Sequence, residues 1–479
     1  NDTYVNFDGI TYAKGASVLK QLVYYVGREK FFQGINQYLN KYAYSNATLA
    51  DLLHELEKAS GRDLKAWSAK WLEESGINTI ATEVEENADG TIASLTLNQT
   101  APAEHPVLRP HRLAVGFYDE DPATGKIVRT DRFELDVDGK STVVAAAAGK
   151  KRPAFILVND DDLTYTKLRF DADSLSFALA NLQHFDDAIA RAVVWLSLWA
   201  MTRDGDLAAE KFIDTTLALL ATETESTTFR YALSCMSTTA WHYTAPDRRA
   251  DVVKHVAKEL WKLVIAAPGG SDQQFQLVTA YLGYGEEGDA EFAEHAQGLF
   301  DGSLIVVGLE IDNNFTWTII NALSSVKLID QAGIDAQLAK RDTTENREFA
   351  LGAHAVRGDA AAKEWAWNEA LNNADLTNMQ LEAVARGFGA TPRPDLAEPY
   401  AAKYYDVVDW VWKNKSFHMA EALLEGLYPY YADPATLVEL GQRWLADHED
   451  ADNALKRIVR GNVESSQRTL KVRDFNAAL

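Results

Sequence analysis

The spacing of apolar residues divides the chain into a helical, an extended and a second helical stretch. Over residues 1–79 apolar side chains recur every three or four positions, which predicts four amphipathic helices that end near Gly27, Tyr42, Gly61 and Gly76. The spacing then changes to alternation, and residues 87–90 (NADG) between two alternating segments are typical of a hairpin turn. From residue 173 onward helical spacing returns in many short blocks.

These patterns predict a mainly α protein with a small β-sandwich, in three domains at residues 1–79, 80–172 and 173–479. A chain of 479 residues exceeds one ordinary core, since a domain holds roughly 100–200 residues. No fixed repeat is visible in the last domain, so we expect an irregular helical solenoid. Its first helix is expected to begin at Asp173-Ser174 and to reach about residue 201, and its last is expected over residues 452–462.

Composition restricts the partners and the compartment. Asp and Glu number 70 against 47 Lys and Arg, a net charge of −23, so no basic footprint for nucleic acid or an anionic membrane is present. No stretch reaches the roughly 18 consecutive apolar residues of a membrane helix. The single cysteine, Cys235, excludes an intrachain disulfide framework and indicates a reducing compartment. We therefore expect a cytoplasmic protein that binds neither nucleic acid nor membrane.

Residue types and spacing alone reveal no complete active site. His54 and Glu55 begin like the zinc motif H-E-x-x-H, but Lys58 stands where the second histidine belongs. A protonated lysine has no lone pair to give to a metal. Cys235 lies in an apolar helical run and is expected in the core. The three consecutive acids at 160–162 are expected to be solvated turn and capping residues rather than cation ligands.

Residues 7–19 (FDGITYAKGASVL) resemble a signature block of the aminopeptidase N family. These are zinc metallopeptidases of the gluzincin type that remove single residues from peptide N-termini. Residues 46–53 and 67–76 resemble the end of the family's thermolysin-like catalytic domain. Residues 158–165 (VNDDDLTY) resemble the segment that follows the last strands of the β-sandwich in actinobacterial members. In that family a β-sandwich and a curved, HEAT/ARM-like helical domain follow the catalytic domain, in the order predicted here.

The resemblance implies a catalytic role for Tyr12. In this family the tyrosine of the signature block donates a hydrogen bond to the oxyanion of the tetrahedral intermediate. A phenol, with a pKa near 10, stays protonated at neutral pH and can donate where charge develops. Arg457 and Arg460 are the candidates among the helical-domain arginines for contact with the C-terminal carboxylate of a peptide.

The family's zinc ligands and its water-activating glutamate precede the tyrosine block, and no H-E-x-x-H precedes Tyr12 here. The resemblance therefore implies the C-terminal part of a zinc aminopeptidase, with zinc in the intact parent enzyme and none bound by this chain. The isolated chain is expected to be inactive, and its partners are peptide substrates and the N-terminal catalytic half, with the helical domain capping the catalytic chamber. Two alternatives stay open: a non-catalytic solenoid scaffold that binds peptides or proteins, and a glycoside-active enzyme with two carboxylates across a cleft.

Overall fold

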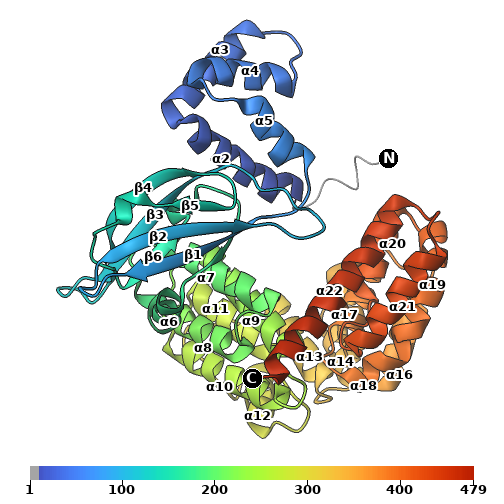
Figure 1. Ribbon diagram of the computed structural model, residues 1–479. Helices are drawn as coiled ribbons and strands as arrows, with labels where there is room; N and C mark the ends of the chain where they lie inside the picture. Colours follow the sequence, from blue (N-terminus) through green and yellow to red (C-terminus); the bar gives the residue numbers. More distant parts are fainter. Residues whose placement is uncertain (1–9) are drawn as a thin grey trace. The chain divides into compact units, whose positions relative to one another are not determined.

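The computed structural model describes residues 10–479, and its contacts divide the chain into two compact units, residues 1–201 and 202–479. The first unit contains helices and two small sheets, and the second is built from helices (Figure 1). The predicted fold class, mainly α with a small β part, is confirmed. The division into three domains at residues 79 and 172 stays a prediction.

The first unit begins with short helices that agree with the expected pattern: a π-helical turn η1 (Ile10–Lys14), α2 (Gly15–Val26), α3 (Arg28–Lys41), α4 (Leu49–Ser60), α5 (Leu64–Ser68) and a second π-helical turn η2 (Ala69–Glu73). Local chemistry sets their ends. The Thr48 hydroxyl accepts from the Asp51 backbone N–H and the Asp51 carboxylate accepts from the Thr48 backbone, a capping box that starts α4. Gly27 ends α2 at φ 90°, where a side chain would be strained.

The two sheets have the strand orders β5-β2-β1-β7 and β4-β3-β6. The strands are β1 (Thr79–Glu86), β2 (Ile92–Thr100), β3 (His111–Glu120), β4 (Ile127–Val137), β5 (Ser141–Val143), β6 (Phe155–Val158) and β7 (Lys167–Arg169). The hairpin expected at residues 87–90 joins β1 to β2 in antiparallel register. β7 pairs with β1 in parallel. This strand is only three residues long, too short for an alternating pattern to predict it.

A single helix over residues 173–201 was expected, and that prediction is wrong. Instead α6 (Ala172–Asn181) begins at Asp171, whose carboxylate accepts from the Ser174 N–H, and α7 (Ala188–Asp204) begins after a break. Phe185 in the break is buried against the rings of Tyr118 and Phe155. Burial of this aromatic ring in the sandwich core interrupts the helix, which local periodicity could not show.

The second unit follows with helices joined by short connections (Figure 1). They are α8 (Ala209–Leu220), α9 (Ser226–Thr238), the π-helical turn η6 (Thr239–Tyr243), α10 (Arg249–Ala266), α11 (Asp272–Leu282), α12 (Ala290–Asp301), α13 (Asn313–Ser325), α14 (Gln331–Lys340), α15 (Thr344–Ala355), α16 (Ala360–Asn372), α17 (Asn378–Gly389), α18 (Pro394–Ala397), α19 (Ala401–Asn414), α20 (Phe417–Gly426), α21 (Pro434–Asp447) and α22 (Asn453–Ala477). Within residues 10–479, no helix is both long and apolar enough to cross a bilayer.

The last helix is longer than expected, because α22 continues past residue 462 to Ala477. Its second half buries polar side chains in place of the apolar residues that periodicity relies on. The Ser466 hydroxyl shares a hydrogen bond with Tyr428, and the side-chain oxygen of Asn476 accepts from the Ala209 N–H at 2.8 Å. This second contact joins the end of the unit to its beginning.

A buried histidine on β3 makes stability sensitive to acid. His111 is fully buried and hydrogen-bonded to Thr164 and Gln99, and burial, aided by the charge of Arg109, lowers its pKa to about 3. The unfolded chain protonates His111 near the ordinary pKa of about 6.5, so between these values the unfolded state binds more protons. The stabilising contribution is therefore present above pH 6.5 and is lost as the pH falls below it.

We expect His111 to account for about 2 kcal/mol of the unfolding free energy lost between pH 7 and pH 5, at about 1.4 kcal/mol per pH unit. Urea unfolding of wild type and His111→Gln at both pH values measures this difference. His54→Gln is the control variant, because His54 is exposed on α4. Equal pH dependence in His111→Gln and wild type contradicts the assignment.

Candidate functional site

Tyr12 lies on an anchored turn and its side chain faces solvent. It belongs to η1, and 66% of its surface is exposed. The following helix, α2, is fixed in the core by the buried side chains Val18, Leu22 and Val26, which pack with Trp67. Phe7, Asp8 and Gly9 of the signature block lie outside the described residues.

The sandwich holds α2 in place through its polar face. Gln21 is fully buried and its side-chain oxygen accepts from the Thr164 hydroxyl at 2.7 Å and from the Tyr165 N–H at 3.2 Å. Lys20 Nζ donates to the backbone carbonyl of Asp161 at 3.1 Å. The segment at 159–165 therefore sets the direction of α2, and with it the position of Tyr12.

Asp160 and Asp161 in that segment are bound to arginines and Asp162 pairs with Lys20, so the expectation of a solvated turn is wrong for Asp160. This side chain is fully buried and accepts from the Tyr118 hydroxyl at 2.6 Å and from Arg129 Nη1 at 2.7 Å. Asp161 accepts from Arg132 Nε at 2.8 Å. These arginines lie on β4, about thirty residues earlier, so only the folded sandwich brings them to the acids.

The two helices that follow Tyr12 in the chain, α2 and α3, expose large apolar side chains. Leu19, Phe32 and Leu39 are 56%, 58% and 61% exposed. α3 buries only Gly34, at a place where a Cβ would come within 2.7 Å of Leu56. An amphipathic helix ordinarily buries an apolar stripe. Phe32 and Leu39 are thus available to a surface that residues 10–479 do not supply.

Arg457 and Arg460 lie three residues apart on α22 in the second unit. Arg460 is exposed, whereas Arg457 is half-buried and close enough to Glu425 to oppose the rise in the pKa of that carboxyl, which burial causes. Tyr12 belongs to the first unit, so the structure describes no single site that contains all three residues. A role for either arginine in binding a peptide carboxylate stays a prediction.

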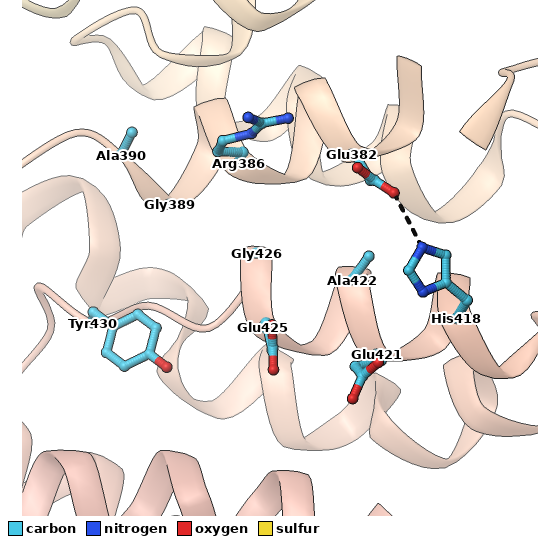
Figure 2. Close-up of a pocket in the computed structure, with 10 residues that line it drawn as sticks. All are labelled: Glu382, Arg386, Gly389, Ala390, His418, Glu421, Ala422, Glu425, Gly426 and Tyr430. Carbon is cyan, nitrogen blue, oxygen red and sulfur yellow. Dashed lines mark ion pairs between the residues drawn. The ribbon is translucent and has the colours of Figure 1, made fainter. Parts of the chain in front are cut away.

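A groove between α17 and α20 gathers charged side chains that the sequence did not single out. Its volume is about 620 Å³, and Figure 2 shows the side chains of the two helices on either side of it. The titratable residues that line it are Glu382 and Arg386 from α17, His418, Glu421 and Glu425 from α20, and Tyr430. The spacing of four within each helix, Glu382 to Arg386 and Glu421 to Glu425, was a visible signal that each pair shares a helix face.

The groove is acidic on one side. Burial and the neighbouring Glu421 raise the pKa of Glu425, although Arg457 opposes this shift. His418 Nε2 lies 3.6 Å from Glu382 Oε1, the ion pair drawn in Figure 2. The carboxylates of Glu421 and Glu425 favour a cationic group on a ligand, whereas the guanidinium of Arg386 favours an anionic one. A peptide segment carries both kinds of charge.

A buried lysine holds the end of α17 beside this groove. Lys363 Nζ donates to the carbonyls of Ala355, Gly387 and Phe388 and to the Thr391 hydroxyl. These bonds join the C-terminal ends of α15 and α17, where carbonyls lack helical partners. Burial lowers the pKa of Lys363 to about 7. Its donors are engaged by the backbone, so its role in the described structure is to hold helices together.

The described residues do not fit a zinc ion. Within residues 10–479, no group of three or more His, Cys, Asp or Glu side chains is arranged to hold a metal. His54 is exposed on α4, and the neighbouring Glu55 is buried and accepts from Lys41 Nζ at 2.8 Å. No step of chemistry can therefore be assigned to a metal held by these residues.

Two family models match the sequence. The ERAP1-like C-terminal domain matches residues 155–468, and the Peptidase family M1 domain matches residues 1–71. The chain belongs to the aminopeptidase N family. The Peptidase family M1 match contains the signature block around Tyr12, and the ERAP1-like match covers most of the helical second unit.

Several aminopeptidases are similar to this member of the aminopeptidase N family. Aminopeptidase N of Streptomyces lividans is 38% identical over 484 residues, which cover 100% of this chain and 56% of the relative. Mitochondrial aminopeptidase 2 of Saccharomyces cerevisiae is 32% identical over 36% of this chain and 18% of its own length. Probable aminopeptidase 1 of Sulfurisphaera tokodaii is 42% identical over 16% of this chain and 10% of its own. The chain thus spans about half the length of the first of these relatives, and less of the others.

Proposed function

We propose that this chain is the C-terminal part of a zinc aminopeptidase that removes N-terminal residues from peptides. The observation that supports this best is that Tyr12, 66% exposed, lies on a turn that is followed by two helices exposing Leu19, Phe32 and Leu39. The apolar surface on α2 and α3 has the character of an interface inside a domain rather than a solvent face. Its proposed occupant is the N-terminal part of the catalytic domain, because the Streptomyces relative is nearly twice as long as this chain.

In this proposal Tyr12 donates its phenolic hydrogen bond to the oxyanion that forms when water attacks the peptide carbonyl. Zinc would polarise that carbonyl and activate the water, and its ligands would lie outside the described residues. The contribution of this chain is thus to place one neutral donor where negative charge develops. The isolated chain is accordingly inactive.

The helical domain caps the catalytic chamber in this proposal and admits short or unfolded peptides. The groove between α17 and α20 supports a role in peptide binding, because its carboxylates and Arg386 can pair with both charges of a peptide. Arg457 and Arg460 remain the candidates for the peptide's C-terminal carboxylate. The same groove is the observation that favours the alternative, a non-catalytic peptide-binding scaffold.

The buried, unpaired Cys235 supports a cytoplasmic location.

Hydrolysis of leucyl-anilide with added zinc tests the proposal. We expect no turnover by the purified chain and turnover after addition of the N-terminal half of the enzyme. Phe32→Glu should prevent this association, because a charge would be buried in an apolar interface. Phe275→Glu is the matched control, since Phe275 is a similarly exposed phenylalanine in the second unit.

If the chain alone hydrolyses the substrate and a chelator abolishes this activity, the proposal that the zinc ligands lie outside this chain is contradicted. If the Phe32→Glu chain still associates with the N-terminal half, the interface assigned to α2 and α3 is wrong. If the joined halves bind peptides in calorimetry but do not hydrolyse them, the scaffold is the correct function.

A further inference from the structure

A second cavity adjoins the groove between α17 and α20. Its volume is about 420 Å³, and it is lined by α17, by α15 and by one residue of α13. Its apolar lining includes Phe349 of α15 and Met379 and Ala383 of α17. Arg386 and Ala390 line both this cavity and the groove, and α17 packs against both α15 and α20. The two hollows are therefore neighbours on either side of α17.

Glycines let the end of α17 lie directly against both neighbouring helices. A Cβ at Gly387 would come within 2.6 Å of the Gly352 carbonyl oxygen on α15, and a Cβ at Gly389 within 2.6 Å of the Gly426 carbonyl oxygen on α20. Because the hollows lie on either side of one helix, their centres are separated by about one interhelical distance, about 8–10 Å. An extended peptide rises about 3.3 Å per residue and covers this distance in about three residues.

The cavity beside α15 suits an apolar side chain. Phe349 is fixed in its wall, since its ring packs on Trp317 with 6.2 Å between ring centroids. Met379 is 53% exposed, and a flexible thioether side chain adapts to the shape of what it covers. A preformed apolar wall with one adaptable side chain is typical of a pocket that receives an aliphatic or aromatic group.

The groove between α17 and α20 holds two acids without a cation. Glu421 and Glu425 lie four residues apart on α20, so their carboxylates share a helix face and repel each other. Among residues 10–479, neither carboxylate has an ion-pair or hydrogen-bond partner, whereas Glu382 pairs with His418 (Figure 2). Arg457 opposes the rise in the pKa of Glu425 only through its charge. A cationic group in the groove would relieve the repulsion between the two acids.

We propose that the two hollows together select peptide substrates by an internal pair of side chains, an apolar one in the cavity beside α15 and a basic one in the groove between α17 and α20. The basic side chain pairs with Glu421 and Glu425. Arg386, which lines both hollows, donates to a backbone carbonyl of the segment that crosses α17. This inference rests on the proposed function and adds to it the class of peptide that is selected. Neither terminus of the peptide takes part.

Calorimetric titration of the purified chain with peptides blocked at both ends tests this selection, because such peptides offer only their backbone and side chains. The probes are acetyl-Leu-Gly-Gly-Lys-amide and the same peptide in the reverse order. We expect one of them to bind saturably, with one peptide per chain. Replacing its leucine by glycine should weaken binding by about tenfold or more, and replacing its lysine by glutamate should abolish binding.

One variant in each hollow tests the assignment of the side chains. Glu421→Gln removes one of the two acids and should weaken binding of the lysine peptide by about three- to tenfold. Met379→Asp places a charge in the wall of the apolar cavity and should weaken binding by about tenfold. Met379 is exposed and Glu421 is half-buried, so both variants should fold. Glu439→Gln is the matched control, because Glu439 is a 69% exposed glutamate on α21, outside both hollows.

The proposal is overturned if the blocked peptides bind equally with and without their leucine and lysine, or if both cavity variants bind as wild type does. It is also overturned if only peptides with a free C-terminal carboxylate bind, because Arg386 would then recognise the terminus. Hydrolysis by the joined halves without this side-chain selection overturns the present inference alone. Selective binding without hydrolysis by the joined halves contradicts the proposed function instead.

Discussion

Replacing Tyr12 by phenylalanine in the enzyme that contains both halves is expected to lower kcat by about 10²–10³-fold. The phenyl ring keeps the packing of the turn and loses only the hydroxyl that would donate to the oxyanion. Because this hydrogen bond strengthens as negative charge develops, kcat should fall while KM changes little. Steady-state hydrolysis of leucyl-anilide at saturating zinc measures both constants.

The matched control for Tyr12→Phe is Tyr44→Phe. Tyr44 is a fully exposed tyrosine of the same helical segment, outside the signature block, so its hydroxyl should contribute nothing to turnover. A Tyr12→Phe enzyme with the kcat of wild type excludes the oxyanion role. A rise in KM with kcat unchanged indicates instead that Tyr12 binds the substrate in its ground state.

Replacing Asp160 by asparagine is expected to destabilise the first unit by about 2–4 kcal/mol. Asp160 is fully buried and carries the negative charge that pairs with Arg129, while Tyr118 donates to its other oxygen. Asparagine is nearly isosteric, so the loss reports mainly the weaker pairing of Arg129, which still donates to Asp161 Oδ1 at 2.9 Å and whose side chain is 35% exposed and therefore partly screened.

Urea unfolding followed by circular dichroism measures the effect of Asp160→Asn. Asp138→Asn is the control, because Asp138 lies in an exposed turn and its carboxylate accepts from the N–H of Gly139. We expect that variant to change the unfolding free energy by less than about 0.5 kcal/mol. If Asp160→Asn is as stable as the control, the ion pair contributes no net stability. The contact of Lys20 with the same loop then becomes the main support for the position of α2.

Local patterns predicted most elements but not their interruptions. The capping box at Thr48 and the stop at Gly61 lie within a few residues of the helix that they bound, so they could be seen in sequence. The break between α6 and α7 could not, because it depends on Phe185 reaching aromatic rings on two other elements. The length of α22 was underestimated for a related reason: Ser466 and Asn476 are polar in sequence and buried in the fold.

The candidate sites divide in the same way. Tyr12 was found through a contiguous block of residues, and the structure adds its exposure and its anchoring through Gln21. The groove between α17 and α20 combines residues from two separate helices, so no single local motif marks it. Periodicity reports which side chains share a face of one element, whereas partners across elements depend on packing.

The sequence by itself therefore determined the order of helical, extended and helical segments, the family resemblance of residues 7–19 and the acidic net charge. These properties depend on neighbouring residues or on composition alone. Only the tertiary structure decided that Asp160 is buried against Arg129, that Gln21 is buried against Thr164, and that α3 buries a glycine beside Leu56. The burial of a polar group depends on what the remaining chain places around it, because desolvation and pairing are properties of the assembled core.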